Sequence, residues 1–313
     1  MRPRSRPALF ALVGLPSFLA LCLSGSAIGA ELYAKKMEIV RTPEGQMTFF
    51  RDSVRISDGE TRISAGWARL NESQSVAVIG DSVVIENSEA VVRADSCVYL
   101  MDEKRTELFG NVRVEQESVV VLAPRLDYLM QESRVNATTG LEVRSRSGDV
   151  TLVGTRGSYD LSRDEGVVEE GPRMTHRQGD DSLVVTARAM RWLAGESRAL
   201  AAGDARVESG RARMSADSLE YFSSADSARA WGAPVVEDNA SRTTGDEVVM
   251  LIRDGGLRRA VISGSAESRY RIESGEQVEL AGSEIRVELV KGEVDVIEVQ
   301  DLLYGRLVRP PGL

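Results

Sequence analysis

The chain is poor in the residues from which catalytic and metal sites are usually built. Its 313 residues contain one histidine, His176, and two cysteines, of which only Cys97 follows the apolar N-terminal segment. A Gly-x-Ser-x-Gly elbow, a Gly-Lys-Ser/Thr phosphate loop and a Cys-x-x-Cys pair are all absent from the sequence. We therefore expect no catalytic residue, no metal ligand, no cofactor and no intramolecular disulfide, with His176 solvated and Cys97 in the core.

Paired acids are the one pattern that would suit acid–base chemistry. They occur at Asp102-Glu103, Asp164-Glu165, Glu169-Glu170 and Asp180-Asp181. Two carboxyl groups are what glycoside cleavage needs, but adjacent acids in short polar loops are usually solvated. An enzyme acting on polysaccharides stays open only as an alternative that would depend on Asp164 or Asp181.

Basic residues are outnumbered by acidic ones, with 39 lysines and arginines against 48 aspartates and glutamates. The formal net charge is −9, and residues 1–30 hold three arginines and no acid, so a chain without them carries −12. A basic footprint is what nucleic acid phosphates require. We therefore expect no nucleic acid partner.

Long apolar runs are limited to the N-terminus. Arg2, Arg4 and Arg6 precede an apolar run over residues 8–23, and small residues fill 24–30. This order predicts a secretory signal over residues 1–30, cleaved after Ala27 or Ala30. An uncleaved segment that anchors the chain in the inner membrane stays open as an alternative.

What the chain does have is a repeat. Glycine recurs at positions 80, 110, 140, 171, 203, 232 and 264, and segments such as ADSCVY (94–99), APRLDY (123–128) and ADSLEY (216–221) recur in step with it. A fixed period of this size indicates stacked supersecondary units that share one core. We predict seven to eight repeats of roughly 30 residues in one elongated domain over 31–300, followed by a tail over 301–313.

Each repeat has the pattern of β-strands. Val112 and Val114 alternate with polar residues, Pro124 interrupts a second apolar run, and polar loops such as 102–105 and 131–134 separate the runs. Short polar loops predict antiparallel hairpins. A column of glycines within the strands predicts that every strand bends at the same level, which would fold one antiparallel sheet into two facing halves.

Two segments carry a resemblance to a known family. They are Gly110–Val114 (GNVRV) with Leu126–Tyr128 (LDY), and Gly203–Val207 (GDARV) with Leu219–Tyr221 (LEY). This pattern resembles the OstA-like family (organic solvent tolerance-like N-terminal domain), whose best-known member is the periplasmic bridge of lipopolysaccharide transport. The similarity covers roughly residues 34–300.

The resemblance implies an all-β, elongated open β-jelly roll that is not an enzyme. It further implies a periplasmic protein that carries lipopolysaccharide or a related lipid toward the outer membrane, with acyl chains in an apolar groove. Other lipopolysaccharide-transport proteins, and further copies of the chain in a head-to-tail homo-oligomer, would join through edge strands. The residues expected to line the groove are Val83, Ile85, Val112, Val114, Val121, Leu126, Tyr128, Val207, Met214, Leu219 and Tyr221.

Two features leave an alternative open. The segments after Gly140 (GLEVR) and Gly264 (GSAES) place charged or polar residues at positions that are apolar in other repeats. The aromatic residues that recur at the end of the second motif are typical of core packing as well as of a lipid path. A structural β-solenoid or surface adhesin with a sealed core is the alternative to a lipid-binding bridge.

Overall fold

The computed structural model describes most of the chain after the predicted signal. Described are residues 31–308 except 44, 58–60, 89, 118, 164, 179–180, 194–195, 197, 210–211, 223–224, 238–240, 254–255, 272–275 and 291–292. The predicted signal over 1–30, the last residues of the predicted tail, 309–313, and the acids Asp164 and Asp180 lie outside the described residues.

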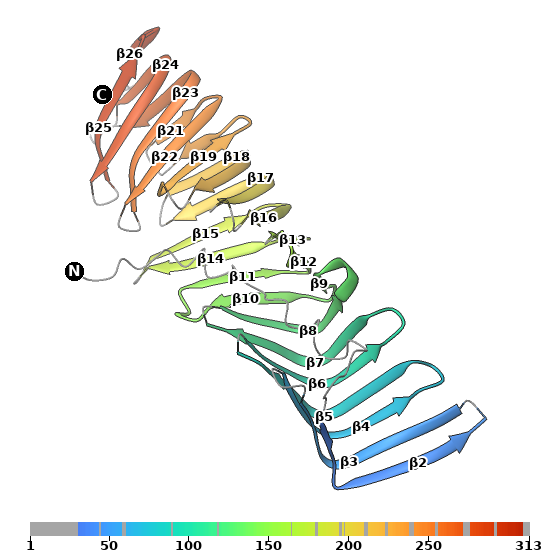
Figure 1. Ribbon diagram of the computed structural model, residues 1–313. Helices are drawn as coiled ribbons and strands as arrows, with labels where there is room; N and C mark the ends of the chain where they lie inside the picture. Colours follow the sequence, from blue (N-terminus) through green and yellow to red (C-terminus); the bar gives the residue numbers. More distant parts are fainter. Residues whose placement is uncertain are drawn as a thin grey trace. The chain divides into compact units, whose positions relative to one another are not determined.

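The described residues are almost entirely β-strand. They form 26 strands and one 3-10 turn, η3 (Met130–Glu132), without an α-helix among them (Figure 1). Strand neighbours pair antiparallel throughout, as in β3 with β4 and β17 with β18. The predicted all-β, antiparallel, jelly-roll-like fold is therefore confirmed. A search of the same residues for a helix long and apolar enough to cross a membrane finds none.

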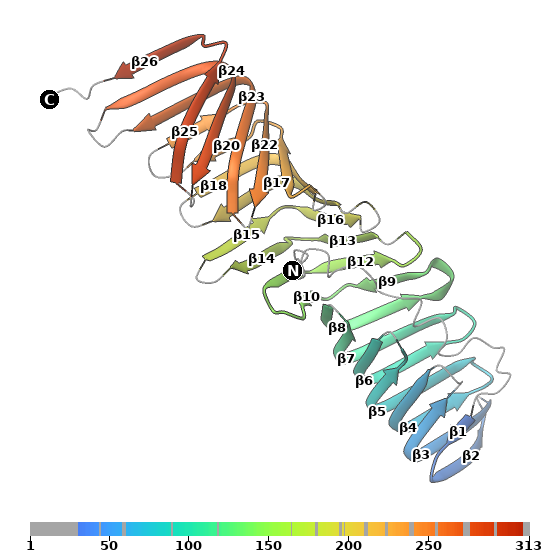
Figure 2. The ribbon, with the colours of Figure 1, turned by 60° about the vertical axis from the view of Figure 1, so that its left-hand side comes forward.

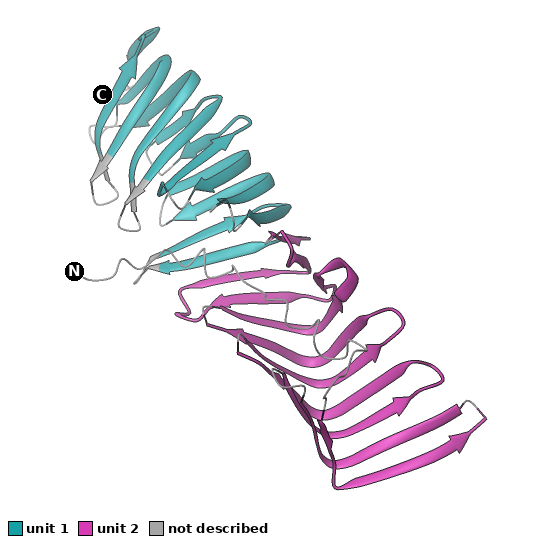
Figure 3. Ribbon diagram, in the orientation of Figure 1, with its two compact units in different colours: residues 1–7, 170–313 teal, residues 8–169 magenta. Residues whose placement is uncertain are grey.

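The strands fall into two compact units (Figure 3). The described part of unit 2 spans residues 31–169. Its strands are β1 (Glu31–Tyr33), β2 (Lys36–Thr42), β3 (Gly45–Ser57), β4 (Arg62–Asn71), β5 (Val76–Glu86), β6 (Ala90–Leu100), β7 (Arg105–Gln116), β8 (Val119–Leu129), β9 (Arg134–Ala137), β10 (Leu141–Ser145), β11 (Val150–Gly154), β12 (Arg156–Asp160) and β13 (Glu165–Glu169).

The described part of unit 1 spans residues 170–308. Its strands are β14 (Arg173–Gln178), β15 (Asp181–Thr186), β16 (Ala189–Leu193), β17 (Arg198–Ser209), β18 (Ala212–Phe222), β19 (Ser227–Trp231), β20 (Val235–Glu237), β21 (Ser241–Thr244), β22 (Glu247–Arg253), β23 (Gly256–Arg271), β24 (Gln277–Val290), β25 (Glu293–Gln300) and β26 (Tyr304–Val308). Within each unit the strands follow one another largely in chain order (Figure 2).

Each long strand of unit 2 bends at a corner, which β7 and β8 illustrate. Phe109 pairs with Arg125 and Val112 with Ala123, so Gly110 and Asn111 of β7 lie opposite the single residue Pro124. Gly110 and Asn111 have φ angles of +71° and +47°, in the left-handed region. Such a two-against-one bulge kinks the sheet, and proline fits there because the bulged position makes no ladder hydrogen bond.

The corner recurs along the chain with the predicted period. Left-handed residues occur at Asp52-Ser53, Asp81-Ser82, Gly110-Asn111, Gly140, Glu170-Gly171, Gly203-Asp204, Gly232-Ala233 and Gly264-Ser265. Six of the seven glycines of the column have this conformation. Gly110, Gly203 and Gly264 lie within a strand, as predicted, whereas Gly140, Gly171 and Gly232 lie between two strands. Gly80 differs, because the left-handed residues of β5 are the next two, and a Cβ on Gly80 would instead overlap the Trp67 ring of β4.

Candidate functional site

All the residues predicted to line the groove lie on one face of the strands, here called the inner face. In β8, Val119, Val121 and Ala123 are buried before the corner and Leu126 and Tyr128 after it, and the residues between them are more exposed except Val120, which is also buried. Of the eleven predicted residues, nine are buried, with exposed fractions of 9% or less, and only Val207 and Tyr221 are half-buried. Alternation therefore identifies this face correctly.

A continuous aliphatic row crosses the inner face of unit 2. Each of its members is the register partner of the next, from strand to neighbouring strand, and all but the first are buried. The members are Ile56, Ile63, Ile85, Val92, Val114, Val121, Val143 and Leu152. Cross-strand contacts between β-branched side chains stabilise a sheet and exclude water from this face.

An aromatic row runs on the other side of the corner. In unit 2, Thr106 lies between Tyr99 and Tyr128, and Val135 lies between Tyr128 and Tyr159, so large side chains alternate with smaller ones. These three tyrosines are at most 4% exposed, as core residues are.

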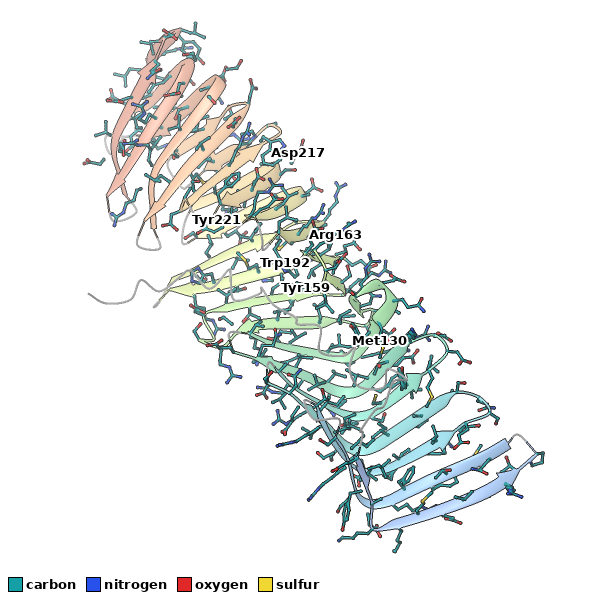
Figure 4. All side chains as sticks on the ribbon, in the orientation of Figure 1. Met130, Tyr159, Arg163, Trp192, Asp217 and Tyr221 are labelled. Atoms are coloured by element: carbon teal, nitrogen blue, oxygen red, sulfur yellow. The ribbon has the colours of Figure 1, made fainter. Side chains whose placement is uncertain are left out.

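The aromatic row of unit 1 has the same plan but is less covered. Ala199 lies between Trp192 of β16 and Tyr221 of β18, and Ala228 follows Tyr221 (Figure 4). Both Trp192 and Tyr221 are half-buried. The same aromatic position is thus sealed in unit 2 and partly accessible in unit 1.

The two repeats that depart from the apolar pattern differ in the residues that face the interior. After Gly140, Glu142 points outward and accepts a hydrogen bond of 2.8 Å from Arg144, while Val143 occupies the inner position. After Gly264, Ser268 is itself an inner residue, 4% exposed, and its hydroxyl lies 2.9 Å from that of buried Thr243. The inner row of unit 1 therefore changes from Met214 and Val236 to a hydrogen-bonded polar pair.

The inner face remains apolar up to the edge strands, a feature that the sequence analysis missed. Leu32 of β1 and Met37 and Ile39 of β2 are register partners of the inner positions of β3 and are 46%, 61% and 54% exposed. Leu307 of β26, the partner of Val278, is 54% exposed. Among the described residues β1 and β2 pair only with β3, and β26 only with β24. The alternation of Met37 and Ile39 in the sequence was the available signal.

The outer face carries cross-strand ion pairs. Glu115 of β7 accepts a hydrogen bond of 2.5 Å from Arg113 and lies 3.0 Å from Arg93 of β6 and 3.9 Å from Arg146. The hydrogen bond from Arg113, helped by the charges of the three arginines, lowers the pKa of the Glu115 carboxyl despite partial desolvation. The contact of Glu115 with Arg93 joins the neighbouring strands β6 and β7 on the outer face.

The candidate chemical residues do not form a site. Cys97 is 3% exposed, and burial raises the pKa of its thiol to about 12, while His176 is half-buried in β14. The acids Asp102, Glu103, Glu169 and Glu170 are exposed, and the side chain of Asp181 lies outside the description. Across the described ranges, acids, histidines and cysteines nowhere gather in threes able to hold a metal ion.

Comparison with known proteins adds little beyond the fold. No family model matches the chain, and no curated protein matches it either. Among solved structures it is similar to one periplasmic component of a transport device. That structure is LptH of Pseudomonas aeruginosa, described as the LptA homologous periplasmic component of the conserved lipopolysaccharide transport device. The match has 11% identity and a TM-score of 0.19, and covers 52% of this chain and 76% of LptH. At that TM-score it carries no functional argument.

Proposed function

We propose that this chain is a non-catalytic lipid-binding bridge of the periplasm, which carries a lipopolysaccharide-type lipid toward the outer membrane. The acyl chains would lie against the inner face, while the sugars stay in water. The proposal combines the OstA-like sequence pattern and the secretory N-terminus with the apolar inner face of the strands.

The observation that carries the proposal is the apolar character of the rows that cross the inner face. Rows of apolar side chains cross from strand to strand, and the arginines and glutamates that pair between strands lie on the outer face. An acyl chain gains about 0.8 kcal/mol for every methylene that it buries against such a surface. A face of this kind therefore suits hydrocarbon.

The uncovered ends of the inner face support a bridge that has partners. The edge strands β1, β2 and β26 present exposed apolar side chains together with edges that have no strand partner among the described residues. Unpaired strand edges associate with other edges by backbone hydrogen bonds. A neighbouring transport protein, or a second copy of this chain, would continue both the sheet and its apolar face.

Site-specific photo-crosslinking in the exported protein tests the function. A photoreactive amino acid is placed in turn at the inner positions Val112, Leu126 and Tyr221, and at the outer position Arg229 as the control. The expected result is a lipopolysaccharide adduct at one or more inner positions and none at Arg229. Absence of an adduct at all three inner positions would reject the proposal.

One observation favours the second candidate, a structural scaffold with a sealed core. The inner residues of β5 to β8 are almost completely buried by one another, Val83, Val92 and Val112 each being 1% exposed. A scaffold would show no lipid adduct at any position, and changes to its inner face would alter only its stability.

A further inference from the structure

Two hairpins, one in each unit, share one design and can be compared position by position. The β7–β8 hairpin of unit 2 has its corner at Gly110 and Pro124, and the β17–β18 hairpin of unit 1 has its corner at Gly203 and Asp217. Gly203 follows Gly110 by 93 residues, and Asp217 follows Pro124 by the same number. Every inner residue of one hairpin therefore has an equivalent in the other.

Four inner residues of the β17–β18 hairpin are smaller than their equivalents in the β7–β8 hairpin. Where β7 has Thr106, Leu108 and Val112, β17 has alanine at 199, 201 and 205, and where β8 has Val119, β18 has Ala212. One exchange goes the other way, with Met214 in the place of Val121. The hairpin of unit 1 thus brings fewer side-chain carbons to its interior.

The exposure of side chains that are identical in the two hairpins shows the effect of the smaller neighbours. Val114 is 4% exposed, but its equivalent Val207 is half-buried, and Tyr128 is 2% exposed, but its equivalent Tyr221 is half-buried. The residue type is the same in each pair, so the surroundings make the difference. The interior of unit 2 is filled by its own side chains, whereas at these positions unit 1 leaves apolar surface accessible.

The accessible surface suits hydrocarbon better than a peptide. The inner positions of β17, β18 and β19 near Tyr221 are alanine, valine, leucine and methionine, and the phenol of Tyr221 is their one polar group. Burial, with a smaller contribution from the negative charge of Asp226, raises the pKa of that phenol, so it is uncharged at neutral pH. A peptide would bring backbone N–H and C=O groups that this surface cannot satisfy, but an acyl chain has none.

We infer that the acyl chains of the transported lipid bind the inner face of unit 1 at β17, β18 and β19, and that unit 2 is a self-packed segment that does not hold them. The inference rests on the proposed function and divides the predicted groove. Val207 and Tyr221, which are half-buried, contact lipid beside the buried residues Met214 and Leu219. The predicted groove residues of unit 2 form an ordinary core; they are Val83, Ile85, Val112, Val114, Val121, Leu126 and Tyr128.

Matched photo-crosslinking tests the division. Azidophenylalanine, which has nearly the size of tyrosine, replaces Tyr221 or Tyr128 in the full chain, and the thermal midpoint of each variant confirms folding. The expected result is a lipopolysaccharide adduct at 221 that exceeds any adduct at 128 by about tenfold. An adduct at 128 as strong as at 221 overturns the inference but leaves the proposed function standing. Absence of any adduct rejects both.

A second test places larger side chains in the interior of the β17–β18 hairpin and measures lipid binding. It needs no photoreactive residue at a buried position. The double variant Ala201→Leu and Ala205→Val gives β17 the side chains of β7 at these two positions. Binding of fluorescent lipopolysaccharide to the folded protein should weaken about tenfold. The control Ala202→Val adds a valine on the outer face of the same strand and should bind as the wild type does. Unchanged binding by the folded double variant overturns the inference, whereas a wild type that binds no lipid counts against the proposed function itself.

Discussion

At the scale of single residues, the polar pair in the interior of unit 1 shows how buried hydroxyl groups must satisfy one another. Thr243 and Ser268 stand in neighbouring strands of a row that is aliphatic in unit 2, and both are buried. Their hydrogen bond of 2.9 Å offsets the cost of removing two hydroxyl groups from water. Each of the two hydroxyl groups is therefore tolerated in the interior only because the other is its hydrogen-bond partner.

The energetics of this pair can be measured. Ser268→Ala should lower the free energy of unfolding by about 1–3 kcal/mol, because it leaves the hydroxyl of Thr243 buried without its partner. The double variant Thr243→Val, Ser268→Ala should recover most of this loss. Chemical unfolding followed by fluorescence gives the double-mutant cycle. Equal destabilisation of the single and the double variant would show that the two hydroxyl groups do not act together.

Cys97 gives a test of how tightly unit 2 is packed. Its thiol is 3% exposed and has a pKa of about 12, so almost none of it is thiolate in the native protein. We expect no reaction with a disulfide reagent at about pH 8, and rapid reaction once guanidinium unfolds the chain. The release of the reagent chromophore reports both. Rapid reaction of the native protein would mean that the interior of unit 2 opens.

The orientation of inner residues could be predicted from the sequence, but their exposure could not. Alternation assigns Val114 and Val207 to the same face, and the structure confirms both. Their different exposure depends on the surrounding side chains. Val114 lies between Val92 and Val121, whereas Val207 lies between Val185 and Met214. Strand register decides which side chains become neighbours, and the local alternation of residues does not reveal the register.

At the scale of the strand, the corner is the element that sets the fold. Gly110 has a positive φ, and a Cβ at this position would overlap the carboxylate of Asp95. That carboxylate also accepts a hydrogen bond of 3.0 Å from Asn111. Backbone conformation and close approach therefore both require glycine here.

A comparison of Gly110 with Gly148 separates the cost of the backbone conformation from the cost of the close approach. Gly148 has a φ of +78°, close to the +71° of Gly110, but no atom lies within 4 Å of the place where its Cβ would be. Gly148→Ala should cost about 1 kcal/mol of unfolding free energy, and Gly110→Ala about 2 kcal/mol or more. Both lie in unit 2, so one denaturant titration compares them. Equal costs would show that the contact with Asp95 is unimportant.

The period of the glycines predicted the level of the corner, but not its residues. At β5 the left-handed residues are Asp81 and Ser82, because short polar side chains tolerate this conformation, and Gly80 makes room for Trp67 instead. At Gly140 the inner positions follow one residue later than the spacing suggested, which turns Glu142 outward. If the periodic glycine is displaced by one residue relative to the inner positions, alternation assigns every following residue of the strand to the wrong face.

The ion pairs between strands predict an acid-sensitive contribution to stability. Since its pKa is lowered in the folded protein, ionised Glu115 stabilises the fold above its ordinary pKa near 4.3, and this stabilisation is lost as the pH falls through the lower folded pKa. Wild type should exceed Glu115→Gln by about 0.2–1 kcal/mol in unfolding free energy at neutral pH. The difference should vanish in acid. A difference that grows as the pH falls would contradict this sign.

At the scale of the whole molecule, the uncovered ends of the inner face predict self-association. Met37 is 61% exposed on the edge strand β2. Met37→Glu should weaken association of the exported chain in sedimentation experiments, because it places a charge at an apolar edge. Val249→Glu, at an outer position that is 41% exposed and away from the edges, is the control. Equal association of both variants with that of the wild type would mean that β2 is not a contact.

The corners also limit how a chain of this kind can change in length. In an even-numbered strand such as β6, three positions lead from the inner residue Ala94 to the next inner residue Cys97, and the corner residue Asp95 lies opposite the two bulged residues of β5. Deletion of Asp95 alone would leave that bulge without its partner and disrupt the corner. Loss or duplication of a complete repeat would preserve every later face. Relatives of this chain should therefore differ in length by steps of about 30 residues, as expected of genes that gain and lose whole repeats.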